Sequence, residues 1–244
     1  MKNKWNSTIE NEKCEVPAKF DNVASSYDWL TSLNPGYRKH LTWSAKRLGL
    51  GPTPRILDLC CGTGISTEAL LDVYPGAKIV ALDASLQMLE CAKRKRRLSN
   101  VQFIHGNAEN PRQFGVNDSF DGIMMAYGIR NVPGRDTCLA NILTLLRPLG
   151  RVCFHEYSVV DSRLASALWN LVSLGIIIPS GRLFSGDASI YRYLRRSVLE
   201  FDGVRRFEER LKELGFVGVH TEQMDGWQRN VLHSFVAARP EAPA

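Results

Sequence analysis

Short apolar runs alternate with longer amphipathic stretches along most of this 244-residue chain. The apolar runs have the length and the β-branched content of strands, and they lie at residues 55–59, 78–83, 101–105, 120–126, 150–156, 216–222 and 230–237. Helical patterns fill the intervals between the first five runs, at 67–73, 85–98 and 136–146. This alternation predicts an α/β fold, in which helices cover both faces of a parallel sheet.

The last two predicted strands follow each other closely across the turn Asp225-Gly226-Trp227. Such a short connection joins antiparallel strands, so we expect a reversed hairpin at the end of the sheet. A Rossmann-like sheet of seven strands with a terminal antiparallel hairpin is the architecture of the class I methyltransferases. The pattern therefore predicts this sheet, together with a helical cover.

Two segments lie outside the alternation and suggest the domain organisation. Residues 16–48 look helical and are interpreted as an amino-terminal lid, preceded by a flexible polar arm at 1–15. The insert at 161–201 has about 40 residues, and a connection of that length with its own helices is usually functional, so we expect it to cover the substrate. The catalytic domain would then span 49–239, and residues 240–244 form a tail.

Composition excludes several classes of protein. The chain is 44% hydrophobic and 23% charged, as is ordinary for a globular protein. No apolar run approaches the ~18 residues that span a bilayer, and the amino end lacks the apolar core of a signal peptide. The sequence thus predicts a cytoplasmic protein with at most peripheral membrane contact. The 6 cysteines form no C-x-x-C pair and are interpreted as free thiols, and no set with metal-ligand spacing appears.

The net charge of +6 comes largely from the cluster Lys93-Arg94-Lys95-Arg96-Arg97. A basic cluster can bind nucleic acid, which leaves an RNA methyltransferase as one hypothesis. One run on one helix is more typical of a solvated helix end, where cations also interact favourably with the helix dipole. We therefore expect no nucleic-acid partner.

The strand at 55–59 carries Asp58 and is followed by a glycine loop, Cys60-Cys61-Gly62-Thr63-Gly64. In the dinucleotide motif G-x-G-x-x-G the glycines admit a pyrophosphate at the helix amino end. Here Thr67 replaces the third glycine. The loop therefore favours a nucleoside without phosphates and points to S-adenosylmethionine, with a nicotinamide-binding domain as the alternative.

Carboxylates at the strand ends complete the expected cofactor site. Asp58 would reach the amino group of the methionine portion, and Asp83, at the end of the second strand, would accept hydrogen bonds from the ribose hydroxyls. Tyr27 could place an aromatic face against the sulfonium, although a packing role is the alternative. The cofactor-binding candidates are Tyr27, Asp58, Gly62, Thr63, Gly64, Asp83, Ala84, Met88, Asn107, Ala108 and Glu109.

Separate stretches between Val16 and Phe235 together resemble the UbiE family, the C-methyltransferases of ubiquinone and menaquinone biosynthesis. The glycine loop and Asp83-Ala84-Ser85-Leu86-Gln87-Met88-Leu89 are shared with methyltransferases broadly. The more specific stretches are Phe20-Asp21-Asn22-Val23-Ala24-Ser25-Ser26-Tyr27-Asp28, Tyr127-Gly128-Ile129-Arg130-Asn131-Val132, and Gly186-Asp187 with Tyr191-Arg192-Tyr193-Leu194.

The resemblance implies methyl transfer to a ring carbon of a prenylated quinol or naphthol, a hydrophobic small molecule. By the same resemblance, Arg130 and Asn131 position the substrate hydroxyl or a water. A ring carbon is a poor nucleophile until a neighbouring hydroxyl loses its proton, and a buried Arg favours the resulting anion. The alternative is that Arg130 ties down its own loop.

Departures from the family pattern leave the acceptor open. His155 stands where the family carries an aliphatic residue, and it joins Arg130 and Asn131 as a catalytic candidate because histidine can take up a proton near neutrality. A hydrogen bond to a backbone carbonyl is the alternative for His155. The runner-up function is a secondary-metabolite C-methyltransferase acting on a terpenoid or prenyl double bond, with or without coupled cyclisation.

Methylation of a double bond creates a carbocation, which aromatic side chains can stabilise. Equally, such side chains can line an apolar pocket for a prenyl tail. The substrate-binding candidates are Trp169, Phe184, Tyr191 and Tyr193. A homo-oligomer, in which subunits exchange the lid or the insert, is also left open.

Overall fold

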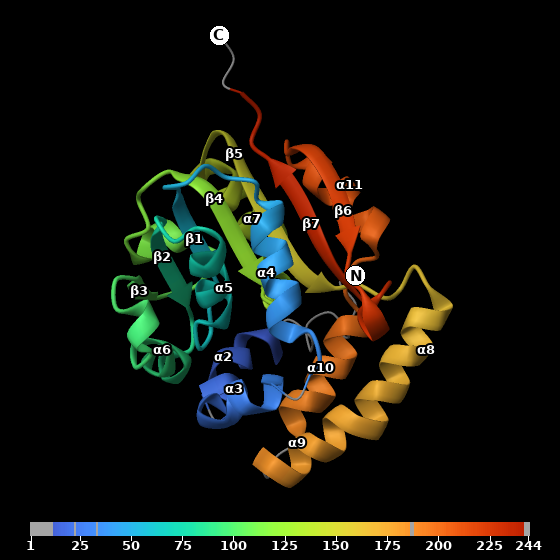
Figure 1. Cartoon of the computed structure of the whole chain (residues 1–244). Coiled ribbons are helices and arrows are strands. Elements are labelled where there is room, and N and C mark those ends of the chain that lie inside the picture. The colour runs from blue at the N-terminus through green and yellow to red at the C-terminus, as the bar shows by residue number, and fades with distance from the viewer. Residues whose placement is uncertain (1–11, 22, 33, 186–187, 242–244) are drawn as a thin grey trace.

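A single seven-stranded sheet forms the centre of the protein, with the strand order β3-β2-β1-β4-β5-β7-β6 (Figure 1). The computed structural model describes residues 12–21, 23–32, 34–185 and 188–241. The strands are β1 Arg55–Leu59, β2 Lys78–Asp83, β3 Gln102–His105, β4 Phe120–Ala126, β5 Leu146–Tyr157, β6 Val217–Gln223 and β7 Leu232–Ala238. Strands β1 to β5 pair in parallel, whereas β7 runs antiparallel to both β5 and β6. The predicted sheet and its terminal hairpin are confirmed.

Helices cover both faces of this sheet and close its lower edge in Figure 1. The helices are α2 Val16–Asp21, α3 Ala24–Ser32, α4 Tyr37–Arg47, α5 Ile65–Val73, α6 Leu86–Lys93, α7 Arg135–Leu145, α8 Arg163–Val172, α9 Ile178–Ser185, α10 Ser189–Leu199 and α11 Val204–Glu213. The segment interpreted as a lid is thus helical in α2, α3 and α4. Of the segment interpreted as an arm, residues 12–14 are helical, and residues 1–11 lie outside the described part.

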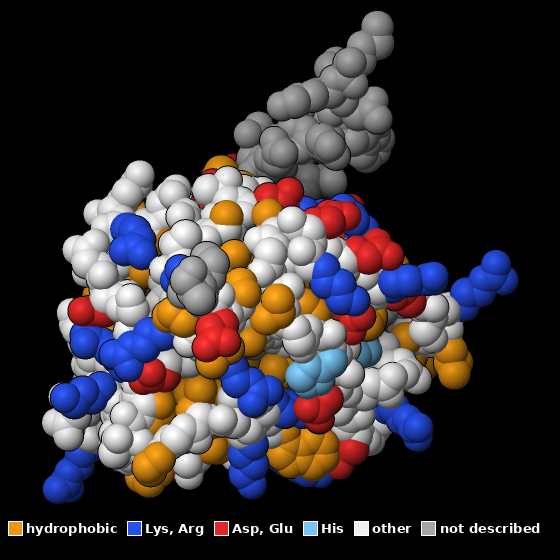
Figure 2. Space-filling model, turned by 90° about the horizontal axis from the view of Figure 1, so that it is seen from above, with side chains coloured by type: hydrophobic (Ala, Val, Ile, Leu, Met, Phe, Trp, Pro, Cys, Tyr) orange, Lys and Arg blue, Asp and Glu red, His pale blue; other side chains and the backbone are white. Residues whose placement is uncertain are grey.

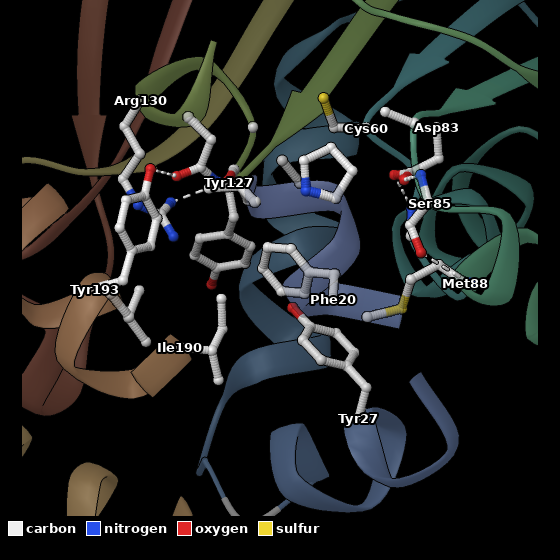
Figure 3. A pocket seen from close by; sticks show the side chains of 18 of the residues that line it. Phe20, Tyr27, Cys60, Asp83, Ser85, Met88, Tyr127, Arg130, Ile190 and Tyr193 are labelled. Atoms are coloured by element: carbon white, nitrogen blue, oxygen red, sulfur yellow. Dashed lines mark hydrogen bonds between the residues drawn. The ribbon is translucent and has the colours of Figure 1, made fainter. Parts of the chain in front are cut away.

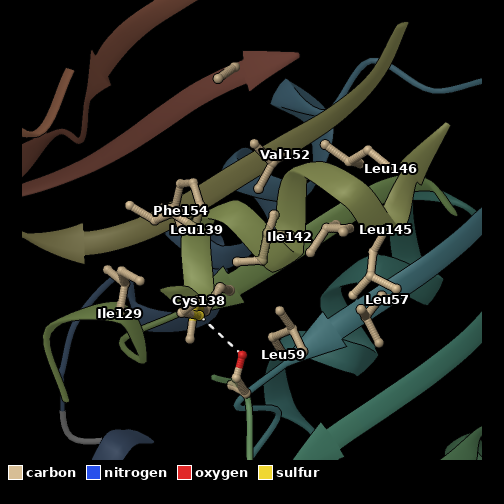
Figure 4. Packing of buried hydrophobic residues seen from close by; sticks show 14 of the residues in the cluster. Leu57, Leu59, Ile129, Cys138, Leu139, Ile142, Leu145, Leu146, Val152 and Phe154 are labelled. Carbon is tan, nitrogen blue, oxygen red and sulfur yellow. Dashed lines mark hydrogen bonds between the residues drawn. The ribbon is translucent and has the colours of Figure 1, made fainter. Parts of the chain in front are cut away.

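Strand β1 shows how the sheet divides the core. Ile56 packs into a cluster with α4 and α5 on one face, whereas Leu57 and Leu59 pack with α7 on the other face (Figure 4). Successive strand residues point to opposite faces, so a strand covered on both sides must be apolar almost throughout. Asp58 falls on the α5 face, where it is fully buried.

In the insert after β5, the sequence pattern predicts one helix at 162–174 and another at 191–199, separated by Pro179-Ser180-Gly181. Instead, α8 continues through a π-helical segment, Ser173–Ile177, into α9. A π turn relaxes the regular hydrogen-bond ladder, which suits a proline that has no N–H to donate. The helix Arg163–Leu183 is therefore long and apolar enough to cross a membrane by length and composition. Trp169, Asn170 and Ser173 interrupt its apolar run without adding charge, which is why the sequence shows no run of ~18 residues.

Helix α11 is absent from the sequence prediction. It is rich in Arg and Glu, and it buries only Phe207 and Leu211. Two apolar positions four residues apart are a weak periodic signal, although they suffice to anchor one helical stripe.

Candidate active site

A cavity of about 460 Å³ lies at the carboxyl ends of the parallel strands (Figure 3). Helices α2, α3 and α10 lie over this end of the sheet (Figure 1). In Figure 3, Asp83, Ser85 and Met88 lie on one side of the cavity, and Arg130 and Tyr193 lie on the other. Most of the residues singled out in the sequence line it. These are Tyr27, Gly62, Asp83, Ala84, Met88, Asn107, Ala108, Arg130, Asn131, Tyr191 and Tyr193.

Asp83 ties together the loops that form one half of the cavity. Its Oδ2 accepts the backbone N–H of Gly62 at 2.8 Å, and its Oδ1 accepts that of Ser85 at 2.8 Å. Burial raises the pKa of Asp83, and its hydrogen bonds to backbone amides oppose that rise. Each carboxylate oxygen has a further lone pair. Asp83 can therefore accept hydroxyl groups of a ligand while it holds both loops.

Gly62 leaves room for that ligand. Its φ is +54°, in the left-handed region that favours glycine. A Cβ placed on Gly62 would meet no atom within 4 Å, so open space lies above the loop. Open backbone beside a strand-end carboxylate fits a nucleoside cofactor.

Asp58 does not line the cavity. Its Oδ2 accepts hydrogen bonds from the hydroxyls of Ser66 at 2.8 Å and Thr67 at 2.7 Å, at the start of α5. Burial raises the pKa of Asp58 to about 7, against the effect of both hydroxyls. Within the described residues, Oδ1 of Asp58 is buried without a hydrogen-bond partner. Because buried polar atoms normally have partners, a water or a ligand ammonium group would satisfy this oxygen. Thr67 thus donates a hydrogen bond to Asp58, which a glycine at the third position of the dinucleotide motif could not do.

Three further cofactor candidates hold the cavity's framework and are not part of its lining. The hydroxyl of Thr63 donates to Asp28 on α3, which links the lid to the glycine loop. Gly64 precedes α5 at φ +83°, and a Cβ there would meet Leu98. Glu109 accepts the backbone N–H of Gly134 at 3.1 Å.

Arg130 and Asn131 form a polar end of the cavity, on the side away from Asp83. Both belong to the short helix η3, Ile129–Asn131. The Tyr127 carbonyl accepts both Arg130 Nη1 at 3.0 Å and Asn131 Nδ2 at 3.1 Å. Arg130 Nη1 also donates to Glu156 Oε1 at 2.5 Å, and these side chains are only 4% and 0% exposed. Tyr193 donates its hydroxyl to Asn131 Oδ1 at 3.1 Å, and burial raises the pKa of Tyr193 to about 12.

His155 lies behind this polar end and does not line the cavity. Its Nε2 is hydrogen bonded to the Tyr127 hydroxyl at 2.9 Å, and its Nδ1 to Ser44 Oγ at 2.7 Å. Burial, together with His40 and Arg47, holds the pKa of His155 well below its usual value. A neutral, fully buried His155 therefore supports Tyr127 and has no direct contact with the space that a substrate would fill.

Tyr127 is held in an uncommon backbone conformation. Its φ is +56°, although it is not a glycine, and its N–H donates to the His155 carbonyl at 2.8 Å. The His155 ring meets the Tyr127 ring edge-on, with centroids 4.8 Å apart. His155 therefore fixes both ends of a residue whose carbonyl positions Arg130 and Asn131.

Trp169 also lies behind the lining, not within it. Its ring packs 4.8 Å from that of Tyr157, and its Nε1 donates to the Arg195 carbonyl at 3.2 Å. The side chain of Phe184 lies outside the described part of the structure. The lining residues that the sequence candidates omit include Phe20, Tyr37, Cys60, Ser85, Tyr127, Tyr157 and Ile190.

A positional signal could have identified several of these. Cys60 and Tyr127 directly follow β1 and β4, and Tyr157 ends β5. Parallel strands deliver their carboxyl ends to one edge of the sheet, so the residue just beyond each strand is a lining candidate.

Three of the five residues of the basic cluster on α6 and the segment after it form ion pairs within the chain. Lys93 contacts Glu90 at 2.9 Å, Lys95 contacts Asp28 at 2.5 Å and Arg97 contacts Asp72 at 2.5 Å. These ion pairs support the interpretation of the cluster as a solvated helix end. In the part of the chain that the structure describes, no group of three or more His, Cys, Asp or Glu side chains could hold a metal ion.

Residues 7–231 match the model of the ubiE/COQ5 methyltransferase family. The chain belongs to this family. It is 32% identical to the demethylmenaquinone methyltransferase of Lactococcus lactis, over 99% of this chain and 95% of that protein. It is 35% identical to a ubiquinone/menaquinone biosynthesis C-methyltransferase UbiE of Rhodopseudomonas palustris, over 89% of each chain. The suspected resemblance is confirmed.

Solved structures support the fold. The [4+2]-cyclase SpnF matches with a TM-score of 0.68 at 16% identity, over 93% of this chain and 96% of that chain. Phosphoethanolamine N-methyltransferase 2 of Haemonchus contortus, in complex with S-adenosylmethionine, matches with a TM-score of 0.66 at 19% identity, over 91% of this chain and 57% of that chain. Family and fold together make this chain an S-adenosylmethionine-dependent C-methyltransferase, as predicted.

Proposed function

We propose that this enzyme methylates a ring carbon of a prenylated quinol or naphthol. Two kinds of observation support the proposal. Relatives at 32% and 35% identity are named for demethylmenaquinone and for ubiquinone/menaquinone biosynthesis. The cavity combines an apolar, aromatic wall with one polar end, which suits an acceptor that has a greasy tail and a hydroxylated ring.

The two halves of the cavity then have separate tasks. S-adenosylmethionine, when bound, supplies an electrophilic methyl group. Asp83 and the open backbone of Gly62 would hold its nucleoside, and Asn107 and Ala108 would border the adenine. At the other end, Arg130 and Asn131 would hold the acceptor hydroxyl, so that the ring carbon faces the methyl group in line.

Arg130 acts mainly as a hydrogen-bond donor in this proposal. Its charge is largely neutralised by Glu156, so its long-range effect on a substrate phenol is reduced. Its Nε donates to Ser197 Oγ at 3.3 Å, and its Nη1 to Tyr127 and Glu156. Among the described residues Nη2 has no partner, so this nitrogen is the donor available to a substrate oxygen.

The proton of the acceptor hydroxyl must also leave before the carbon can react. Glu156 is ion-paired with Arg130 and does not line the cavity, so it cannot take this proton directly. Tyr193, with a pKa of about 12, stays protonated at neutral pH. We therefore assign proton removal to a water held by Arg130 and Asn131, which accepts the proton of the acceptor hydroxyl and passes it on to bulk solvent. The shared carbonyl of Tyr127, which positions both side chains, is the observation that carries this assignment.

The test is turnover of a short-chain prenylated naphthohydroquinone with labelled S-adenosylmethionine, followed by mass spectrometry. We expect one methyl group on a ring carbon. Asp83→Ala should weaken cofactor binding about tenfold or more, roughly 1.4 kcal/mol, in titration calorimetry. Cofactor binding without methylation of any quinol or naphthol would count against the acceptor class alone.

A second candidate is C-methylation of an isoprenoid double bond, with or without cyclisation. The aromatic wall favours it, because a carbocation formed by methyl addition lies best against ring faces. This wall consists of Phe20, Tyr27, Tyr37, Tyr127, Tyr157, Tyr191 and Tyr193. A tailless naphthohydroquinone should be methylated under the first proposal and ignored under the second. A cytoplasmic location and a homo-oligomer stay predictions.

A further inference from the structure

The continuous helix from Arg163 to Leu183 has one face that the rest of the fold leaves open. Its inner face is anchored by Ala165, Trp169 and Ser173, all buried. Its outer face carries large apolar side chains with high exposure. These are Leu164 at 80%, Leu171 at 70%, Leu174 at 56%, Ile176 at 61% and Leu183 at 76%. Figure 1 shows α8 and α9 along the outer edge of the molecule, beside α10.

Scattered exposed leucines are ordinary, but a contiguous stripe on one helix marks a surface that contacts another apolar phase. The spacing from Leu164 to Leu171 to Leu174 follows helical periodicity, so these side chains share one stripe. The helix passes the length test for a membrane span. However, Trp169 fixes its other face to Tyr157 and to the Arg195 carbonyl. A helix anchored in this way can lie on a membrane and cannot cross it.

Positive charge predominates in the segment that carries this stripe. Between residues 163 and 199, Asp187 is the single acidic residue, whereas five arginines occur. Arg163, Arg182 and Arg192 are exposed. Arginines beside an apolar helix face are typical of interfacial helices that bind anionic lipid, where each cation strengthens binding.

The opposite end of the molecule has a different character. Figure 2 shows that face, with Lys and Arg side chains interspersed among Asp and Glu and with scattered hydrophobic ones. That face mixes both signs of charge, whereas the exposed charges on α8, α9 and α10 are arginines, among them Arg163, Arg182 and Arg192.

We propose that the outer face of the helix Arg163–Leu183 docks in plane on an anionic phospholipid membrane surface. The same helix contributes Ile177 to the cavity lining, and α10 contributes Ile190 and Leu194. A docked enzyme thus places apolar cavity walls next to the lipid, where a prenylated acceptor would be dissolved. This last step rests on the proposed function, whereas the docking itself does not.

Vesicle flotation tests the docking without any turnover. The probes are vesicles of phosphatidylcholine alone and vesicles of phosphatidylcholine mixed with phosphatidylglycerol. We expect wild type to float with the mixed vesicles and to bind the neutral ones at least about tenfold less. Leu164→Ser/Leu171→Ser should lose binding about tenfold or more. Leu149→Ser/Val217→Ser is the matched control, because these side chains are 61% and 44% exposed elsewhere on the surface, and it should bind as wild type does.

Arg163→Gln/Arg182→Gln should retain binding to neutral vesicles and lose most of the preference for anionic ones. The proposal is overturned if wild type binds neither vesicle, or if the leucine variant binds as tightly as the control. It is also overturned if wild type sediments as a dimer that the leucine variant dissociates while vesicles stay unbound. That outcome would make the stripe an interface between copies. Methylation assays do not enter these outcomes, so failure of the proposed acceptor would leave them unchanged.

Discussion

The buried pair of Arg130 and Glu156 allows the two hypotheses for Arg130 to be separated. Glu156→Gln removes the negative charge and leaves the guanidinium enclosed, because Arg130 is 4% exposed and Glu156 is 0% exposed. Breaking one side of a buried pair costs about 3–5 kcal/mol, because the remaining charge has no compensation. For a domain of this size each kcal/mol shifts Tm by about 2–4 °C, so we expect a fall of about 6–20 °C.

Thermal unfolding followed by circular dichroism measures this shift. The control is Glu213→Gln, which removes a carboxylate from an exposed pair with Arg206 at 2.9 Å. An exposed pair contributes about 0–1 kcal/mol, so the control should melt within a few degrees of wild type. If Glu156→Gln melts together with the control, the carboxylate is not compensating a buried charge and our reasoning about the site fails.

Arg130→Met combined with Glu156→Gln completes the argument. Removal of both charges should restore most of the melting temperature, since replacement of a whole buried pair is often neutral. If Arg130 holds the acceptor hydroxyl, turnover should stay low in this stable double variant. Recovery of turnover together with stability would show that Arg130 only ties down its loop.

Three further results are expected. His155→Leu and Tyr127→Phe should each lower kcat and leave cofactor affinity unchanged. The double variant should lose little more activity, because both substitutions remove the same hydrogen bond between His155 and Tyr127. A change in the acidic limb of the pH–rate profile for His155→Leu would contradict a positioning role. Asp58 has a folded pKa of about 7, above its unfolded value, so the folded state binds the extra proton and stability falls as pH rises from about 4 to 7. Asp58→Asn should flatten that slope in Tm measurements on the cofactor-free protein and raise Tm at pH 8, and an unaltered slope would refute the assignment. Asp83→Asn should weaken cofactor binding in calorimetry about tenfold, whereas equal affinity would place the ribose elsewhere.

Strand positions are the part of the fold that sequence patterns predict best. Strands covered on both faces are apolar throughout, so β1, β2 and β4 stand out as continuous runs. Helix α11 is missed because only two of its side chains reach the core. The continuation of α8 into α9 is missed because local rules treat Pro179 as a helix breaker, whereas the π-helical segment before it changes the pattern of hydrogen bonds.

The candidate site is predictable where a side chain follows a strand and obscure where packing decides. Asp83 and Asn107 reach the cavity because their strands end there. His155 is among the last residues of β5, yet the alternation of side chains along the strand points its ring toward Ser44 on α4 and away from the cavity lining. Trp169 shares the aromatic character of the lining, but Tyr157 stands between it and the cavity. Whether a side chain lines the cavity or packs behind the lining residues depends on tertiary structure, and the neighbouring residues in the sequence carry little information about it.

The left-handed backbone of Tyr127 has a practical consequence for engineering. Glycine adopts this conformation without the roughly 1–2 kcal/mol that a side chain adds, so Tyr127→Gly looks like a stabilising change from the backbone alone. It would also delete a ring that packs against Tyr37, His155 and Tyr157, and truncation of a packed aromatic costs about 3–5 kcal/mol, which outweighs the gain. The same replacement would free the carbonyl that aligns Arg130 and Asn131. Directed evolution of this scaffold for durability should therefore keep position 127 fixed and make its changes elsewhere.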